Sequence, residues 1–357
     1  MAILFCDGFD QYGVLTDAYA FWSATTGSPS AEISDDTPYG RGKSVKFNNV
    51  AGLNDGLRIP LGQKLTTLGC AFHIKISEYP LGTASRGIIE FYLNSSGAQC
   101  SLALNNNGQI RFVRSEGNAT SVNNTLFVSP NALPLNEWVH VEFKVYIANS
   151  GGYGELRVNG NVEATISNID TQDESNGGCD LLRVGNVYTN VTAYAPGAIL
   201  IDNFVCWDAS GTQNNDFLGE VEVATLFPNA DVDITDWTPS SGSDGYAMID
   251  EDAPDGDDTY IYSDVEDAVA QFELSSLPSG NMKILAVQPM ALARKDDSGE
   301  RGIQIGVVSD EEVAEADPFM LGLGYAVTKK VFEIDPATDL SWEKSAVNAL
   351  QIRAKVI

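Results

Sequence analysis

The stretch Trp138-Val-His-Val-Glu-Phe-Lys-Val-Tyr146 decides the fold class. Every second residue from Val139 to Val145 is apolar, and the residues between them are polar. Successive side chains of a β-strand point to opposite faces, so this pattern predicts an antiparallel strand with one buried face. A helix would instead need apolar residues three to four positions apart.

Short apolar runs of this kind recur along the first 210 or so residues. We expect strands at Ala2–Cys6, Ser44–Phe47, Gly69–Ile76, Gly87–Leu93, Ser101–Leu104, Ile110–Arg114, Trp138–Tyr146, Gly154–Val158 and Ile199–Trp207. The turns Asn105-Asn-Asn-Gly108 and Asn159-Gly160 predict hairpins, because Asn and Gly tolerate the positive φ of tight turns. The sequence therefore predicts an all-β protein, with two antiparallel sheets packed face to face up to about Asp208.

A segment without large apolar residues, Asp208–Asp216, reads as a linker. We expect one domain over residues 1–211 and a smaller β-rich domain over residues 212–357. A strand at Gly219–Phe227 would open the second domain. Its further expected elements are strands at Ala268–Leu274, Met282–Leu292, Gly302–Val308 and Val331–Ile334, and helical turns at Asp310–Glu315 and Ser345–Leu350.

The chain is strongly acidic, with a formal net charge of −28 over 357 residues. Residues 1–211 hold 20 acidic and 12 basic side chains, whereas residues 212–357 hold 29 and 9. Such a field repels phosphate backbones, so nucleic acid is not an expected partner. The N-terminal MAILFCDGFD has no basic segment, and no apolar stretch approaches 18 residues, so neither a secretory signal nor a membrane span is expected.

Cysteine and histidine usage gives no sign of a metal centre. The five cysteines, an odd number, include no CxxC pair, and Cys6, Cys70 and Cys206 lie in apolar strand-like runs, which predicts buried free thiols. His73 and His140 are the only imidazoles, and each lies in an alternating run. We interpret both as histidines of a polar sheet face or of the core, and expect no metal and no cofactor.

The motifs that would mark an enzyme are missing or broken. A retaining glucanase with a β-sandwich fold carries E-x-D-x-x-E on one strand, which sets two carboxylates about 5 Å apart. Glu333-Ile-Asp335 is followed by Thr338 at the acid position, and Glu315-Ala-Asp317 by Met320. No G-x-S-x-G, Walker or G-x-G-x-x-G motif is present. We expect no catalytic residues, and glycoside hydrolysis is only a third hypothesis.

An acidic loop spans Asp250–Asp258. A regular EF-hand is excluded, since Pro254 and Asp255 occupy its fifth and sixth positions and Ile261 its twelfth. Two interpretations stay open: a solvated loop, or an irregular calcium site formed by some of Asp250, Asp252, Asp255, Asp257 and Asp258.

Four short motifs carry a resemblance over residues 1–210: Leu4–Asp10, Asn136–Glu142, Glu155–Gly160 and Ile201–Phe204. They resemble the concanavalin-A-like lectin/glucanase (laminin-G-like) jelly rolls of tailed-phage virion proteins. Gly219–Pro228, Asp236–Pro239, Asp335–Thr338 and Val347–Leu350 look like the C-terminal regions of tail or virion structural proteins.

The resemblance implies a structural or interaction protein of a phage virion, assembled in the host bacterial cytoplasm. Its expected partners are other virion proteins and further copies of itself. The alternative is a receptor-binding lectin for host surface glycan, which would need exposed aromatic side chains. Candidates for such side chains in the first domain are Trp22, Tyr39, Tyr188 and Tyr194.

Overall fold

The computed structural model describes residues 2–24, 31–48, 55–81, 85–95, 97–114, 124–173, 177–186 and 197–357. Strand makes up 51% of the structure and helix 4%, which confirms the all-β prediction. The α-helices of the described part are α1 (Leu15–Ala18) and α2 (Lys344–Asn348). No helix among the described residues has the length and apolar character needed to cross a membrane.

The chain forms two compact units that are both discontinuous in sequence. We call Ala2–Phe9 with Val14–Val223 the sandwich unit, and Asp10–Gly13 with Ala224–Ile357 the C-terminal unit. Residues 212–223, which we had expected in the second domain, group with the sandwich unit. The short Asp10–Gly13 segment groups with the C-terminal unit.

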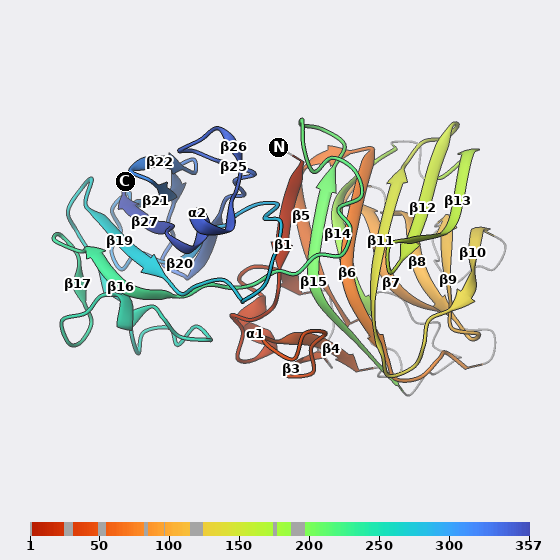
Figure 1. Ribbon diagram of the computed structural model, residues 1–357, viewed down its shortest axis with the longest axis horizontal. Helices are drawn as coiled ribbons and strands as arrows, with labels where there is room; N and C mark the ends of the chain where they lie inside the picture. The colour runs from red at the N-terminus through yellow and green to blue at the C-terminus, as the bar shows by residue number, and fades with distance from the viewer. Residues whose placement is uncertain are drawn as a thin grey trace. The chain divides into compact units, whose positions relative to one another are not determined.

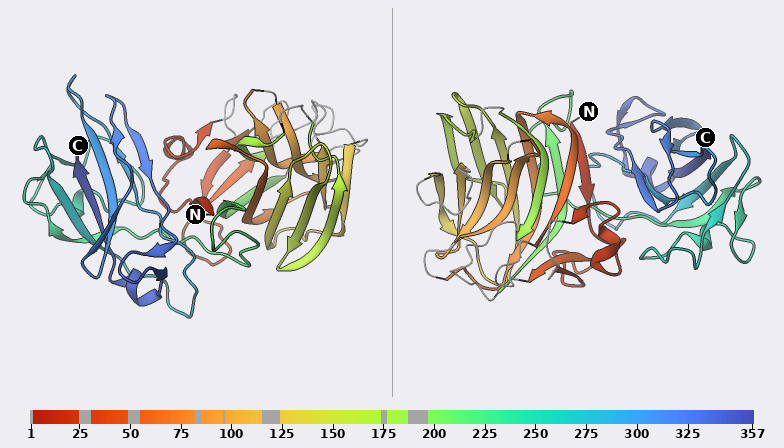
Figure 2. Two further views of the ribbon diagram at one scale, coloured as in Figure 1. Left: turned by 90° about the horizontal axis from the view of Figure 1, so that it is seen from above. Right: turned by 180° about the vertical axis from the view of Figure 1, so that it is seen from behind.

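Two antiparallel sheets form the sandwich unit and appear as stacked layers in Figures 1 and 2. Sheet A has the order β13-β12-β11-β6-β15-β4-β3, with β1 also paired to β15. Its strands are β1 (Ile3–Asp7), β3 (Ala31–Ser34), β4 (Ser44–Asn48), β6 (Thr67–Ile76), β11 (Trp138–Tyr146), β12 (Gly152–Val158), β13 (Asn161–Ile169) and β15 (Ala198–Asp208).

Sheet B has the order β10-β9-β8-β7-β14-β5-β2. Its strands are β2 (Ser23–Ala24), β5 (Asp55–Leu65), β7 (Ser85–Leu93), β8 (Gly97–Asn105), β9 (Gln109–Arg114), β10 (Thr125–Ala132) and β14 (Cys179–Asn186). Each of the nine strands expected in this region is present. The hairpin turn at Asn159-Gly160 is confirmed by φ angles of 49° and 76°, and Gly108 has a φ of 78°.

The apolar faces of the two sheets meet in the core of the sandwich unit. The ring of Phe143 in sheet A lies 4.9 Å from Phe112 and 5.8 Å from Phe91 in sheet B, between ring centroids. The predicted alternation in β11 is confirmed, since Phe143 and its alternate neighbours point into this core. The prediction of only one buried face is wrong, because His140 and Glu142 on the other face are also buried. Cys70, Cys100, Cys179 and Cys206 are buried, as expected, whereas Cys6, which we had also expected to be buried, is only partly so.

The N-terminal motif Leu4–Asp10 contains a buried carboxylate, Asp7, that accepts two hydrogen bonds inside the protein. Asp7, at the end of β1, accepts hydrogen bonds from the Trp22 indole Nε1 at 2.6 Å and from the Phe9 backbone N–H at 2.7 Å. Trp22 is 1% exposed, and its ring contacts those of Phe5, Phe9 and Phe204. Asp7 thus ties the first strand to the aromatic core.

The C-terminal unit is built on a smaller antiparallel sheet of order β16-β19-β27-β21-β22, with β23 also paired to β21. These strands are β16 (Pro228–Asp233), β19 (Val269–Leu274), β21 (Gly302–Ser309), β22 (Glu312–Glu315), β23 (Phe319–Met320) and β27 (Gln351–Val356). Three two-stranded pairs accompany it: β17 (Thr238–Pro239) with β18 (Ile261–Tyr262), β20 (Met290–Ala293) with β24 (Ala326–Lys329), and β25 (Ile334–Asp335) with β26 (Leu340–Ser341). A 3₁₀ turn, η2, spans Tyr246–Met248.

Several local predictions for this unit were wrong. The expected strand Gly219–Phe227 is absent, and the first strand of the unit starts at Pro228. The expected helical turn Asp310–Glu315 is instead a tight turn followed by β22, because Asp310 and Glu311 adopt positive φ values of 46° and 74°. The expected strand Met282–Leu292 is reduced to β20, whereas α2 confirms the helical turn expected at Ser345–Leu350.

Candidate functional site

A row of polar side chains crosses four neighbouring strands of sheet B. Arg58 on β5 lies opposite Arg183 on β14, Arg183 opposite Glu90 on β7, and Glu90 opposite Ser101 on β8. We call these four residues the arginine row. No local motif pointed to it, because the row is created by strand register rather than by sequence spacing.

The arginine row lies on the face of sheet B that points away from the sandwich core. Phe91, which follows Glu90, packs against Phe143 of sheet A. Successive side chains of a strand point to opposite faces, so Glu90 and the residues paired with it point outward. Within the row Arg58 and Arg183 are partly exposed, while Glu90 and Ser101 are buried.

The arginine row places two positive charges next to each other, with a carboxylate beside only one of them. The Arg183 Nη1 atom is 2.9 Å from Glu90 Oε2. Arg58 has no carboxylate opposite it, and like charges that face each other across strands are unfavourable. Burial, together with the positive charge of Arg183, lowers the pKa of Arg58. Burial also raises the pKa of Glu90, although Arg183 opposes that effect.

Each residue of the row has a side-chain atom that makes no hydrogen bond to the described residues. The Nε atoms of Arg58 and Arg183, Glu90 Oε1 and Ser101 Oγ are buried and have no hydrogen-bond partner among the described residues. The guanidinium carbon of Arg183 also lies 3.6 Å from the centre of the Tyr92 ring. The site thus combines an aromatic face, two cationic donors and a carboxylate, which are the groups that position polar ligands.

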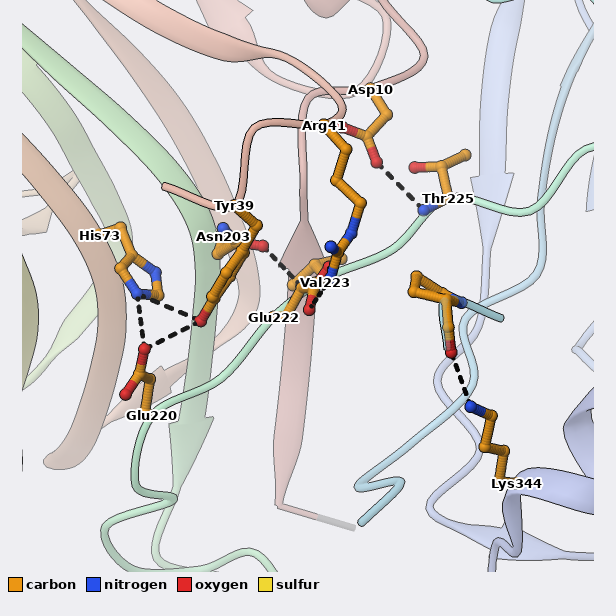
Figure 3. A network of polar contacts seen from close by, with 11 residues as sticks. Asp10, Tyr39, Arg41, His73, Asn203, Glu220, Glu222, Val223, Thr225 and Lys344 are labelled. Carbon is orange, nitrogen blue, oxygen red and sulfur yellow. Dashed lines mark hydrogen bonds and ion pairs between the residues drawn. The ribbon is translucent and has the colours of Figure 1, made fainter. Parts of the chain in front are cut away.

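The outer face of sheet A is different, because the chain itself crosses it. Residues 216–223, which we call the strap, run over β11, β6 and β15 without joining a sheet. The backbone N–H groups of Leu218 and Gly219 donate to Glu142 Oε1 at 2.8 and 3.0 Å. The Val223 N–H donates to Asn203 Oδ1 at 2.6 Å (Figure 3).

Side-chain contacts hold the strap along its whole length. Lys144 binds Asp216 at 2.9 Å, and the Arg157 guanidinium lies 3.6 Å from the centre of the Phe217 ring. Further along, Arg41 donates two hydrogen bonds to Glu222, of 2.8 and 2.7 Å (Figure 3). Acidic strap residues therefore pair with basic residues around the face of the sheet.

Both histidines of the chain lie side by side on this face. His73 and His140 are direct cross-strand neighbours on β6 and β11, with ring centroids 5.0 Å apart. Glu220 of the strap places Oε1 3.5 Å from His73 Nε2 and accepts a 3.1 Å hydrogen bond from the Tyr39 hydroxyl (Figure 3). The interpretation of His73 and His140 as polar-face histidines fits this position.

Burial controls the protonation of this cluster. It lowers the pKa of His73, and it lowers the pKa of His140 to about 4, with the charge of His73 adding to the effect. Burial raises the pKa of Glu142, although the hydrogen bonds that it accepts from two strap N–H groups act to lower it. The histidine pair is thus held neutral at ordinary pH.

The aromatic candidates for a lectin site are not brought together. Trp22 is a core residue, and the Tyr39 hydroxyl binds Glu220. Tyr188 and Tyr194 lie outside the described residues. The arginine row, with Tyr92 beside it, is the candidate site among the described residues.

The acidic loop of the C-terminal unit uses several carboxylates in hydrogen bonds. Asp257 accepts from Arg294 and from the Tyr325 hydroxyl, the latter at 2.7 Å. Thr259 donates to Asp255 and Glu251. Among the described residues no cluster of three or more His, Cys, Asp or Glu side chains has the arrangement of a metal site.

The family comparison agrees with the architecture of the sandwich unit. Residues 52–215 match the family model of the concanavalin A-like lectin/glucanases superfamily. A concanavalin A-like superfamily domain therefore lies at residues 52–215. No curated protein sequence matches the chain.

Solved structures with similar folds include enzymes of carbohydrate chemistry. A sialidase has 15% identity and a TM-score of 0.41, covering 59% of this chain and 19% of its own. An alginate lyase has 11% identity and a TM-score of 0.41, covering 56% and 95%. The conserved carbohydrate esterase of the Shiga toxin-encoding bacteriophage phi24B has 22% identity and a TM-score of 0.35, covering 52% and 89%. This chain thus spans about a fifth of the sialidase.

Proposed function

We propose that this chain is a non-enzymatic interaction protein of a tailed-phage virion, and that its concanavalin A-like domain binds an acidic saccharide. The arginine row carries the binding proposal. Arg58 and Arg183 face each other across two strands and are partly exposed, and only Arg183 has a carboxylate opposite it, so a further carboxylate bound beside Arg58 would reduce their mutual repulsion. The Tyr92 ring, which packs against the Arg183 guanidinium, adds an aromatic group beside the two arginines.

Binding of the purified full chain to polygalacturonate and to neutral dextran tests this proposal. We expect saturable binding to the carboxylated polymer and little to dextran. Arg58→Gln should weaken it about tenfold or more, the usual effect of losing one charge-assisted hydrogen bond. Arg58 is the residue of choice because Arg183→Gln would leave the buried Glu90 without its cation.

The matched control is Arg294→Gln, since Arg294 is a partly exposed arginine of the C-terminal unit that pairs with Asp257. It should bind polygalacturonate like the parent. Equal binding of dextran, or unchanged affinity in Arg58→Gln, would overturn the saccharide proposal.

The virion role is supported by the resemblance of residues 1–210 and of the C-terminal segments to phage structural proteins. It predicts that the chain co-purifies with intact phage particles at a fixed ratio to the other structural proteins. Quantitative mass spectrometry of gradient-purified particles measures this ratio. A ratio that falls with each purification step would argue for a contaminant.

The proposal that the protein is not an enzyme follows from the missing E-x-D-x-x-E strand. We expect the purified chain to release no reducing ends from bacterial polysaccharides. Steady release that a single Asp or Glu substitution abolishes would reverse this assignment.

A further inference from the structure

The strap is held in a way that differs from every sheet strand of the sandwich unit. Leu218, Gly219 and Val223 donate their backbone N–H groups to side chains of sheet A, not to the backbone of another strand. A ladder of backbone hydrogen bonds is insensitive to pH, whereas a segment fixed by ionisable side chains is not. The strap can therefore be released without breaking a sheet.

Beneath the strap lies a histidine pair with spare hydrogen-bonding atoms. His140 is 2% exposed, and neither of its ring nitrogens has a partner among the described residues. His73 is 3% exposed, and its Nδ1 also lacks one there. A proton added to His140 would place an imidazolium in a buried site, 5.0 Å from the second ring, where the described residues supply no hydrogen-bond acceptor to either nitrogen.

We propose that the strap is an acid-released cover, and that protonation of His73 and His140 frees residues 216–223 from the outer face of sheet A. Opening brings water to both rings and separates Glu220 from His73. It also uncovers a surface of sheet A that includes Glu142 and Arg157.

Several charged groups surround the pair and modify the effect. Glu220 and Glu222 approach from the strap and favour the charged form of His73. Tyr39 approaches from the loop before β4, Asp202 is the cross-strand neighbour of His73 on β15, and Glu142 follows on β11. For His73 the effect of burial outweighs these acids, because the pKa of His73 is lowered.

The direction of the pH effect follows from the lowered histidine pKa values. An imidazole exposed by opening titrates near 6.5, whereas His140 under the strap has a pKa of about 4. The open state therefore binds protons more readily, and closure weakens as the pH falls between these two values. Glu142 acts in the opposite direction, since its pKa is raised under the strap and acid removes the cost of burying its charge.

Hydrogen–deuterium exchange of the full chain tests the proposal through the peptide that covers the strap. After correction for intrinsic exchange, we expect its protection to fall about tenfold or more between about pH 7 and about pH 4.5, since one pKa unit corresponds to a factor of ten. Peptides from β6 and β11 should stay protected, which separates strap release from global unfolding.

Three variants sharpen the experiment. His140→Asn should reduce the pH dependence, and His73→Asn combined with His140→Asn should abolish it. Glu142→Gln keeps an acceptor for the strap N–H groups and removes the titration of Glu142, which opposes the effect of the histidines. Strap protection in this variant should therefore fall more steeply with pH than in the parent chain. Strap protection that does not change with pH in the parent chain, or that is lost together with protection of β6 and β11, overturns the proposal whether or not the variants fold.

Discussion

At the scale of single residues, Asp7 anchors the N-terminal motif to the core of the sandwich unit. Its two oxygens accept from Trp22 Nε1 and from the Phe9 N–H inside the protein. Asp7→Ala leaves both buried donors without this acceptor. We expect the free energy of unfolding to fall by about 2–4 kcal/mol, measured by chemical denaturation.

The control for Asp7 is Asp35→Ala, since the Asp35 side chain is 93% exposed and pairs with Lys43 only at 3.8 Å. It should change the unfolding free energy by less than about 0.5 kcal/mol. Equal effects of the two substitutions would contradict the anchoring role of Asp7.

The buried cysteines give a second prediction at this scale. Burial raises the pKa of the Cys70, Cys100 and Cys179 thiols, so they stay protonated at mildly alkaline pH. The thiolate is the reactive form, so these groups should resist a thiol reagent in the native protein and react fully in denaturant. Rapid native labelling of all three, located by peptide mass spectrometry, would show that the core opens readily.

At the scale of elements, Asn203 sets both a bulge in β15 and the end of the strap. It has a φ of 52°, lies within a register irregularity of the β15–β6 pairing, and accepts the Val223 N–H. Asn203→Ala should cost about 2 kcal/mol of unfolding free energy, through backbone strain and the lost hydrogen bond.

The matched variant Asn203→Gly separates the two causes. Glycine adopts a positive φ without strain but cannot accept the hydrogen bond. The Asn203→Gly variant should therefore lose only about half as much unfolding free energy as Asn203→Ala, as measured by the same denaturation experiment. A glycine variant as unstable as the alanine variant would assign the whole effect to the strap contact.

Strands with a clear alternation were predictable from the sequence because their pattern is local. Trp138–Tyr146 has the predicted bounds, and Asn159-Gly160 is the predicted tip. The turn at Asp310-Glu311 was misread as helical, since acidic residues rarely signal two consecutive positive φ values. The expected strand at Gly219–Phe227 failed for another reason: a strand needs a pairing partner, and an extended segment that packs through its side chains has the same sequence pattern.

The candidate site could be predicted only in part, for a related reason. Alternation within β7 indicates that Glu90 points away from Phe91. The register between strands distant in sequence brings Arg58, Arg183 and Glu90 into one row. No local sequence pattern contains that register. The pairing of His73 with His140 was hidden in the same way.

At the scale of the whole molecule, the uneven charge predicts how the protein would attach to its neighbours in the proposed virion. Residues 212–357 hold 29 acidic and 9 basic side chains, so we expect the acidic region to dock on a basic or polar neighbour. Exposed charges are screened beyond about 8 Å at physiological ionic strength, so attachment should weaken as salt rises.

The measurement is rebinding of the purified chain to particles that lack it, over a salt series with and without a chelator. Salt should release the protein and the chelator should not. Release by chelator alone would favour the calcium interpretation of the Asp250–Asp258 loop over direct docking.

The linker around Ala209–Asn215 should be the first site of limited proteolysis, since it lies in bends and irregular structure beyond the end of β15. Cleavage there leaves the strap on the C-terminal fragment and Asp10–Gly13 on the N-terminal one. We therefore expect the nicked protein to elute as one species from a sizing column, and to separate only in denaturant. Early cleavage spread through the strands of the sandwich unit would contradict this prediction.

The interleaving of the two units also constrains how such a gene can change. Asp10 accepts the Thr225 N–H, and the side chains of Gln11 and Thr225 are hydrogen-bonded, so a piece of the first dozen residues completes the unit that begins more than 200 positions later. A single recombination breakpoint cannot transfer either unit whole. A hybrid joined at residue 211 would combine a sandwich without its strap and a second unit without residues 10–13, and only exchanges that replace both segments together would preserve both folds.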